Sequence, residues 1–401
     1  MTDLDIRVLD DAHYRAAHTL FRGALHHPPA PDDRWEIART SYDPGRAFGA
    51  FAGDELVGTV QSFPSRLAVP GGAVVPMAAV SRVGVRADWT RRGVLTALQR
   101  AQLRAMRESG DVAASLRASE GAIYERFGYG VATRVREVRV KRATARSRQP
   151  IAGRVRLVEP AAAGDLVGSL FERVSPGRAG TIARWQGWWN LNVLHEEGAH
   201  QRYAIASGPD GDDGYVVYKV TAYSYENGVE KPAVLTVLDL WAATPRAWAD
   251  LWVFLLGIDL VDEVGAEGRP VDEPLEWLLV DRRALRVVDV MDETWLRLVD
   301  VEAALSARAY RPGGSVVIGV RDRFLPENEG SYLITSSGAS RTTGEPDFVV
   351  DVDVLGAAYL GDVAFGALAA AGRFAAGSPE AVARADALFA VDQAPWCGTF
   401  F

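Results

Sequence analysis

The chain has 401 residues, enough for two or three domains, and its 48% hydrophobic and 24% charged residues are ordinary for a globular protein. A formal net charge of -8 argues against a general nucleic-acid binder. The single cysteine, Cys397, excludes an internal disulfide, and its apolar neighbours favour an inert packed thiol over a nucleophile. The first residues lack the features of a signal peptide and the most apolar run, 251–258, is too short to span a bilayer, so we expect a cytoplasmic protein.

The first predicted elements are a strand, a helix and a hairpin. Alternating apolar residues over 6–8 predict the strand, and apolar residues at helical spacing follow it. Gly53 and Asp54 separate two apolar stretches, which is a hairpin signal. The pair His26 and His27 is flanked by prolines that favour a loop, and so few histidines with one cysteine predict no metal site.

A strand, a glycine-containing loop and a helix come next. Residues 78–85 predict the strand and residues 93–108 the helix. The helix has one apolar stripe, which would pack on a sheet, formed by Val94, Leu98, Ala101 and Ala105. This order of elements is the framework of a ligand site at a helix N-terminus.

The middle of the chain repeats this pattern without its loop. A basic stretch, 141–153, predicts a solvated connector, because no aromatic residues interleave with its cations as a nucleic-acid site would need. Residues 234–242 then predict a strand, Thr244 and Pro245 supply an N-cap and a first-turn proline, and residues 246–256 predict a helix. We interpret this as a duplicated domain that lost its ligand site.

The last part of the chain predicts an α+β unit, because strands are followed by helices. We expect a helix over 293–305, then strands, then apolar helices, and a tail over 394–401. The expected strands are 316–320, 331–335 and 348–352, and the expected helices are 355–360, 363–374 and 379–389.

The loop before the helix at 93–108 carries the first chemical signal. Gly93 would let the backbone approach an anion, and the unpaired N–H groups of the first helical turn would bind phosphate. Arg91 and Arg92 add charged donors suited to a pyrophosphate. The alternative is a structural helix start with surface arginines. The loop lacks the glycine patterns of NAD-binding and ATP-binding proteins, which argues against those ligands.

The second signal is the segment 119–130, which contains Ile-Tyr-Glu-Arg-Phe-Gly-Tyr-Gly. Together with the Arg-Arg-Gly loop it resembles the GCN5-related N-acetyltransferase (GNAT) superfamily, and more closely its enhanced-intracellular-survival (Eis) branch. The resemblance covers the whole chain. It implies an α+β fold of tandem GNAT domains with a C-terminal domain similar to sterol carrier protein. The expected domains are a catalytic GNAT domain over 1–145, a degenerate one over 146–288 and the sterol-carrier-like domain over 289–401.

The resemblance also implies a site for acetyl-CoA. The pantetheine arm would bond the backbone of Val83, Gly84 and Val85. The pyrophosphate would be wrapped by the loop and first helical turn, formed by Arg91, Arg92, Gly93, Val94, Leu95 and Thr96. Ser119 and Glu120 would border the thioester. The sequence departs from the general GNAT loop at Thr90, where Gln or Arg is usual, and at Leu95, where Gly or Ala is usual; Eis-like proteins share the second departure.

Two catalytic groups follow from the same resemblance. Tyr124 stands at the general-acid position, where a phenol near pKa 10 could stabilise a leaving thiolate whose thiol has a pKa of about 8.5. The alternative is a core tyrosine bonded to a backbone carbonyl. The general base would be the main-chain carboxylate of Phe401, a weak base of pKa about 3.5 that needs a water relay or burial. Glu120 and Glu125 rank below Phe401 as bases.

The chain end and a tryptophan cluster each have two interpretations. A terminus usually frays, but the apolar residues of 396–401 favour a docked tail. Trp185, Trp188 and Trp189 could form a cation-binding cage, although packing between domains is the stronger interpretation.

We expect acetylation of primary amines on a small polycation such as an aminoglycoside antibiotic, in a wide pocket lined by Asp32, Asp33 and Trp35. The alternatives are acetylation of polyamines or protein lysines, or a non-catalytic protein that binds an apolar ligand in its C-terminal domain. The resemblance implies a homo-oligomer, a hexamer in Eis-like proteins. No nucleic-acid or membrane partner is expected.

Overall fold

The computed structural model describes residues 4–192, 201–226 and 229–401. The chain divides into two compact units, which are described separately. The first unit comprises residues 1–133, 178–188 and 293–401, and the second comprises residues 134–177 and 189–292. None of the described helices combines the length and the apolar character that a bilayer-spanning helix needs.

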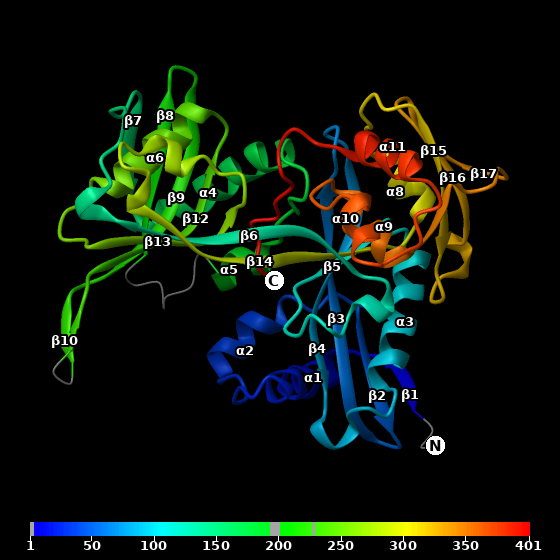
Figure 1. The fold of residues 1–401 in the computed structure, drawn as a ribbon. Coiled ribbons are helices and arrows are strands. Elements are labelled where there is room, and N and C mark those ends of the chain that lie inside the picture. Colours follow the sequence, from blue (N-terminus) through cyan, green and yellow to red (C-terminus); the bar gives the residue numbers. More distant parts are fainter. Residues whose placement is uncertain (1–3, 193–200, 227–228) are drawn as a thin grey trace. The chain divides into compact units, whose positions relative to one another are not determined.

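The N-terminal part of the first unit is a mixed sheet flanked by helices (Figure 1). Its strand order is β1-β2-β3-β4-β5-β14. The strands are β1 (Asp5–Val8), β2 (Ala47–Ala52), β3 (Glu55–Ala68), β4 (Val74–Val85), β5 (Ala113–Leu116) and the end of β14 (Leu285–Leu298). The helices are α1 (Asp11–Ala24), α2 (Asp32–Arg39) and α3 (Val94–Glu108).

Local sequence signals explain several of these elements. Gly53 adopts a φ of 63° in the tight turn where Ala52 pairs with Glu55, which confirms the predicted hairpin. The apolar stripe of α3 packs on the sheet, and a Cβ on Gly58 of β3 would lie 2.5 Å from the Val94 side chain. The close approach of α3 to the sheet therefore depends on a glycine in the strand.

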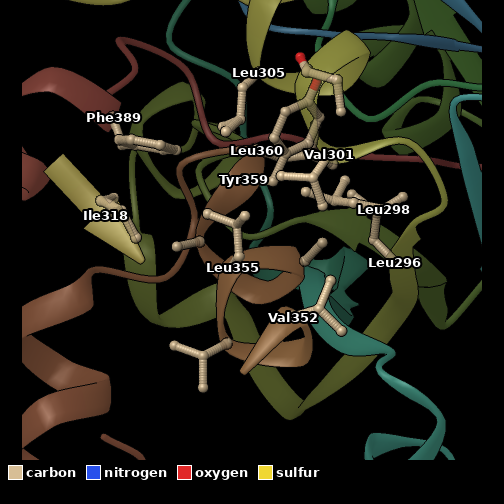
Figure 2. Close-up of a cluster of buried hydrophobic side chains, with 14 of the residues drawn as sticks. Leu296, Leu298, Val301, Leu305, Ile318, Val352, Leu355, Tyr359, Leu360 and Phe389 are labelled. Atoms are coloured by element: carbon tan, nitrogen blue, oxygen red, sulfur yellow. The ribbon is translucent and has the colours of Figure 1, made fainter. Parts of the chain in front are cut away.

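The C-terminal part of the first unit is a second, smaller sheet covered by helices. Its strand order is β17-β16-β15-β18. The elements are α8 (Val301–Ala307), β15 (Ser315–Arg321), β16 (Gly330–Thr335), β17 (Gly338–Thr342), β18 (Phe348–Asp351), α9 (Val352–Tyr359), α10 (Phe365–Ala370) and α11 (Pro379–Phe389). Figure 2 shows its core, where Leu355 and Tyr359 of α9 meet Leu296 and Leu298 of β14. The same cluster includes Met77 of β4, so this part shares a core with the N-terminal sheet.

The predicted helix over 293–305 is wrong. Residues 293–298 end the strand β14, whose Trp295–Leu298 segment pairs antiparallel with β5, and the helix α8 begins only at Val301. All side chains of 293–298 are buried, so the strand lacks the alternation of apolar and polar residues that identifies a half-exposed strand. Asp300 marks the true helix start, because its side chain accepts the N–H of Ala303 at 3.0 Å.

The second unit is built on another mixed sheet, of order β6-β13-β12-β9-β8-β7. Its strands are β6 (Gly130–Lys141), β7 (Arg154–Val158), β8 (Gln201–Gly208), β9 (Gly211–Thr221), β12 (Val234–Ala242), β13 (Glu263–Pro270) and the start of β14. The ribbon of β10 (Ser224–Glu226) and β11 (Val229–Lys231) extends from this sheet (Figure 1). Its helices are α4 (Pro160–Val174), α6 (Pro245–Leu256), α7 (Leu275–Leu278) and most of α5 (Gln186–Asn192).

The two units contain the same strand–helix–strand arrangement. In the first, β4 and β5 are parallel and α3 lies between them in the chain; in the second, β12 and β13 are parallel and α6 lies between them. Thr244 caps α6 by accepting the N–H of Ala247 at 3.1 Å, and Pro245 follows as predicted. The internal repetition is confirmed. Its second copy enters the helix directly from the cap, without the Arg-Arg-Gly turn.

Candidate functional site

The strands β4 and β5 pair over only three residues each and then part. The parallel register runs from Met77 with Ala113 to Ala79 with Ser115. Further along β4, residues 83–85 pair with no described strand on the edge that faces β5. On the opposite edge, Gly84 and Val85 still pair with β3. Half of the backbone groups of this segment are therefore left without a described strand partner, and an extended ligand could bond them.

A bulge in β4 marks the point where the strands part. The register with β3 shifts here, and Arg82 adopts a φ of 51°, which is uncommon for a residue with a side chain. The Arg82 guanidinium is buried, where it donates to Gln61 Oε1 at 2.8 Å and to Ser41 Oγ at 2.9 Å. Burial lowers the pKa of this guanidinium. Its bonds hold the bulge and so fix the course of Val83 to Val85.

The loop before α3 presents main-chain donors to solvent. Gly93 is the N-cap of α3 with a φ of 85°, and a Cβ built on it would meet nothing within 4 Å. Arg91 also has a positive φ, of 62°. The N–H groups of the first helical turn, from Val94 on, have no intrahelical carbonyl to bond, and they lie at the positive end of the helix dipole. Neither arginine of the loop is paired with a carboxylate of the described chain, and Arg92 lies 5.0 Å from the Trp89 ring centroid.

Tyr124 is buried, with 7% of its surface exposed, in the turn that follows Ser119 and Glu120. Its ring contacts that of Tyr129 edge to face, with 6.0 Å between centroids. Its hydroxyl makes no hydrogen bond to any residue that the structure describes, so the predicted alternative of a core tyrosine bonded to a carbonyl does not apply within that part of the chain. Burial, with the nearby charge of Glu120, raises the pKa of Tyr124 to about 12.

The glycines of the Phe-Gly-Tyr-Gly segment allow the C-terminal part to pack against the Tyr124 turn. A Cβ on Gly130 would lie 2.0 Å from the carbonyl oxygen of Asp353, at the start of α9. Gly128 has a φ of 88°, and a Cβ added to it would lie 2.6 Å from Arg297 Nε. Arg297 donates to the carbonyl of Phe127 at 2.9 Å and forms a fully buried ion pair with Asp322 at 2.7 Å. The turn that carries Tyr124 is therefore held by residues of β14, α9 and the loop after β15.

The tail, residues 394–401, is docked rather than frayed. Trp396 and Cys397 are buried, and burial raises the pKa of the Cys397 thiol to about 11, as expected for an inert packed cysteine. Phe401 is half-buried, and its ring lies 6.3 Å from that of Trp185, which in turn stacks on Phe63 of β3 at 4.4 Å. An aromatic stack thus supports the last residue of the chain.

Two elements far apart in the sequence bind the main chain of the tail. Arg117, directly after β5, donates to the carbonyl of Thr399 at 2.9 Å. Glu293 of β14 accepts the N–H groups of Cys397 at 3.0 Å and Gly398 at 2.8 Å. Because Arg117 precedes Ser119 by two residues, the tail lies against the start of the segment that leads to Tyr124. The structure thereby joins the two predicted catalytic regions through Arg117.

Other predicted residues have different surroundings. Asp32 and Asp33 lie in the first turn of α2, where Asp32 pairs with Arg15 on the surface. Trp35 is buried in a cluster with Tyr14 and Tyr42, so an acceptor would reach it only at its edge.

The three tryptophans do not form a cage around one cation in the described residues. Trp185 supports Phe401, and Trp188 stacks with Arg184 at 4.0 Å and donates to the carbonyl of Phe400. Trp189 contacts Phe171 within the second unit.

Sequence reasoning missed Arg117, Arg184 and Glu293. Arg117 and Arg184 are single charged residues between apolar neighbours, Glu293 follows another carboxylate, Asp292, and none of the three belongs to a recognisable motif. The one available signal was a charged side chain within a buried run, since such a group must be paired when it is buried. Glu293 stands immediately before the run Thr294 to Leu298, but the helical prediction for this run hid that signal.

Comparisons with known proteins agree with this architecture. Residues 5–132 and 180–298 match two models of the acetyltransferase (GNAT) domain, and residues 301–398 match the sterol carrier protein domain. An uncharacterized N-acetyltransferase of Streptomyces avermitilis is 38% identical over 98% of both chains. The N-acetyltransferase Eis of Mycobacterium bovis is 34% identical over 86% of this chain and 85% of its own. The crystal structure of Eis1 from Mycobacterium abscessus superposes with a TM-score of 0.90 at 40% identity, with both chains fully covered.

Proposed function

Because this chain belongs to the Eis-like N-acetyltransferases of the GNAT superfamily, we propose that it acetylates primary amines of a polycationic acceptor such as an aminoglycoside. Acetyl-CoA is the co-substrate that the GNAT fold implies. The observation that carries the proposal is the docked tail, which brings the end of the chain to the segment that leads to Tyr124. Aminoglycosides carry several amines, and the net charge of -8 favours their approach to the protein.

The residues of the loop fit a phosphate-bearing co-substrate. Space for an anion is open at Gly93, where no atom would meet a Cβ, and the first-turn N–H groups of Val94, Leu95 and Thr96 face it. Arg91 and Arg92 would add charged bonds to the pyrophosphate. The unpaired side of Val83, Gly84 and Val85 would bond the amides of the pantetheine arm, and Ser119 and Glu120 would border the thioester.

Acetyl-CoA would supply an acetyl thioester whose carbon–sulfur bond breaks as the bond to the amine nitrogen forms. Tyr124 would act at the sulfur. A phenol with a pKa of about 12 stays protonated at neutral pH, and transfer of its proton to a thiolate whose thiol has a pKa of about 8.5 is uphill. We therefore assign Tyr124 mainly a hydrogen bond to the leaving thiolate. A desolvated donor of this kind stabilises charge that develops as the bond breaks.

The carboxylate of Phe401 would act at the amine. An ammonium group cannot attack a carbonyl carbon, so the acceptor must lose a proton before or during the transfer. A carboxylate of pKa about 3.5 is a weak base, but held beside the cation it can orient the amine and pass its proton to water. Docking of Phe401 on Trp185 supports this role, because a frayed terminus could not hold one position. Glu120 and Glu125 are exposed, which leaves them less suited to desolvate an amine.

The acceptor would be recognised by acidic and aromatic groups. Asp32 and Asp33 present two carboxylates in the first turn of α2, both open to solvent, and Trp35 lies behind them. The family also leads us to propose a cytoplasmic homohexamer. Light scattering on the purified protein tests that assembly, and a mass of one chain contradicts it.

Release of CoA thiol in the presence of an amine panel tests the function. The panel comprises aminoglycosides, polyamines and lysine peptides, each with acetyl-CoA. We expect turnover on aminoglycosides, with products heavier by one or more acetyl groups. Turnover confined to polyamines or to peptides would mean that the acceptor is a polyamine or a protein lysine and not an aminoglycoside. No turnover on any amine would contradict an acetyltransferase of this kind.

A further inference from the structure

We propose that Glu293 and Arg117 are positioning residues that fix the end of the chain, so that the carboxylate of Phe401 is held at the acetyl-transfer site. This inference rests on the proposed role of that carboxylate. A chain terminus loses its order easily, and a base must stay in one place to act on an amine. A protein that uses its own terminus therefore needs strong and specific bonds to the residues just before it.

Glu293 uses both of its oxygens for this purpose. Oε1 accepts the N–H of Gly398 at 2.8 Å and Arg117 Nη2 at 2.8 Å. Oε2 accepts the N–H of Cys397 at 3.0 Å and Thr133 Oγ1 at 2.8 Å. The Glu293 side chain is 0% exposed, so these four donors replace all of its water. A buried carboxylate with such partners is costly to disturb, because each donor is left unpaired when it moves.

Arg117 connects this carboxylate to the next residue of the tail. The nitrogen that binds Glu293 also donates to the carbonyl of Thr399 at 2.9 Å, and Nε donates to the same carbonyl at 3.2 Å. The guanidinium lies 5.5 Å from the Phe400 ring centroid. Arg117 directly follows β5 and precedes Ser119 by two residues, so one side chain fixes the tail relative to the segment of Tyr124.

Two residues of the segment 178–188 also bind the tail. Arg184 donates to the carbonyl of Gly398 at 2.9 Å and to Thr399 Oγ1 at 3.1 Å, and the Trp188 indole N–H donates to the carbonyl of Phe400. Each main-chain unit from 397 to 400 is thus bound by a side chain from elsewhere in the first unit. Burial of Trp396 and Cys397 already anchors the start of the tail. The additional bonds run toward Phe401, which is itself only half-buried.

Glu293→Gln is the variant that tests this. An amide has one acceptor oxygen, so its NH₂ group must face either Cys397 N–H or the pair formed by Gly398 N–H and Arg117. At least one bond to the tail is lost while the side chain keeps its size. Glu273→Gln is the matched control, because Glu273 is also a buried glutamate paired with an arginine, Arg269, but belongs to the second unit.

Two readouts are measured on the full-length protein. Hydrogen exchange of the Cys397 and Gly398 amides, followed by mass spectrometry of the C-terminal peptide, reports the bonds themselves. In Glu293→Gln the exchange should quicken by about tenfold or more, and kcat should fall by about tenfold at an unchanged KM for acetyl-CoA. Glu273→Gln should leave both the exchange of the tail and kcat within about twofold of the parent, whatever it does to stability. A purely structural role for Glu293 would lower the fraction of active protein without this pattern.

Unchanged exchange at Cys397 and Gly398 in Glu293→Gln would overturn the inference, as would faster exchange with an unchanged kcat. Extending the chain by one glycine after Phe401 separates the inference from the function on which it rests. If the extended chain loses turnover while Glu293→Gln keeps it, only the positioning role fails; if both keep it, the carboxylate is not the base. Should Glu293→Gln not fold, Arg117→Gln tests the same point, because it removes both bonds to the Thr399 carbonyl and should also lower kcat at constant KM.

Discussion

Gly130→Ala should uncouple the C-terminal part from the Tyr124 turn. A Cβ at this position would lie 2.0 Å from the carbonyl oxygen of Asp353 and 2.6 Å from the amide nitrogen of Ala357, both in the backbone of α9. An ordinary carbon–oxygen contact is about 3.3 Å, so α9 must move by about 1 Å or more. Backbone cannot rotate away as a side chain can. We expect a cost of about 3 kcal/mol, at the upper end for overpacking of a core.

Scanning calorimetry and steady-state kinetics measure this effect. A loss of about 3 kcal/mol should lower the Tm of the transition that includes the first unit by about 6 to 12 °C. Because α9 packs beside the turn, kcat should fall as well. Gly23→Ala is the control: it lies in α1, nothing is within 4 Å of its Cβ, and alanine favours a helix, so Tm should stay or rise slightly. A Tm for Gly130→Ala within about 2 °C of the parent would refute the argument from close packing.

Three further predictions concern the catalytic groups. Tyr124→Phe should lower kcat by about 10² or more with little change in the KM for acetyl-CoA. The control, Tyr129→Phe, removes a buried hydroxyl with no partner among the described residues and should retain most activity. Equal effects of the two substitutions in initial-rate assays would count against a role for the Tyr124 hydroxyl. Because the protonated phenol is the active form and its pKa is raised to about 12, kcat should not decline through deprotonation of Tyr124 between pH 7 and 10; an alkaline limb near pH 10 that Tyr124→Phe removes would contradict this. The double substitution Arg91→Ala with Arg92→Ala should raise the KM for acetyl-CoA by roughly tenfold and weaken its dependence on salt, while Arg104→Ala, an exposed arginine later on α3, should do neither.

Short-range signals in the sequence predicted much of the fold. Gly53 with Asp54 marks a hairpin, Thr244 with Pro245 marks a helix start, and both lie where expected because a turn or a cap is decided by a few adjacent residues. The strand over 293–298 was missed for the opposite reason. Its side chains are buried on both faces by partners distant in sequence, so its pattern of apolar residues carries no period of two.

The candidate site was predictable only in part. The loop at Gly93 and the segment of Tyr124 are continuous stretches, and their chemistry can be recognised residue by residue. The bonds that hold the tail join Arg117, Arg184 and Glu293 to residues 397–399, at sequence separations of 104 to 282 residues, and no local pattern connects them. The raised pKa of Tyr124 is likewise a consequence of burial, which the sequence around it does not specify.

The role of the chain end is the central claim, and adding one glycine after Phe401 tests it most directly. The added residue moves the carboxylate by one residue while every side chain of the site is kept. We expect kcat for acetyl transfer to fall by about 10² or more, with the KM for acetyl-CoA within about twofold of the parent and the Cys397 and Gly398 amides still protected from exchange. An extended protein that acetylates the amine at the parent rate would contradict the claim, and Glu120 and Glu125 would then be the candidate bases.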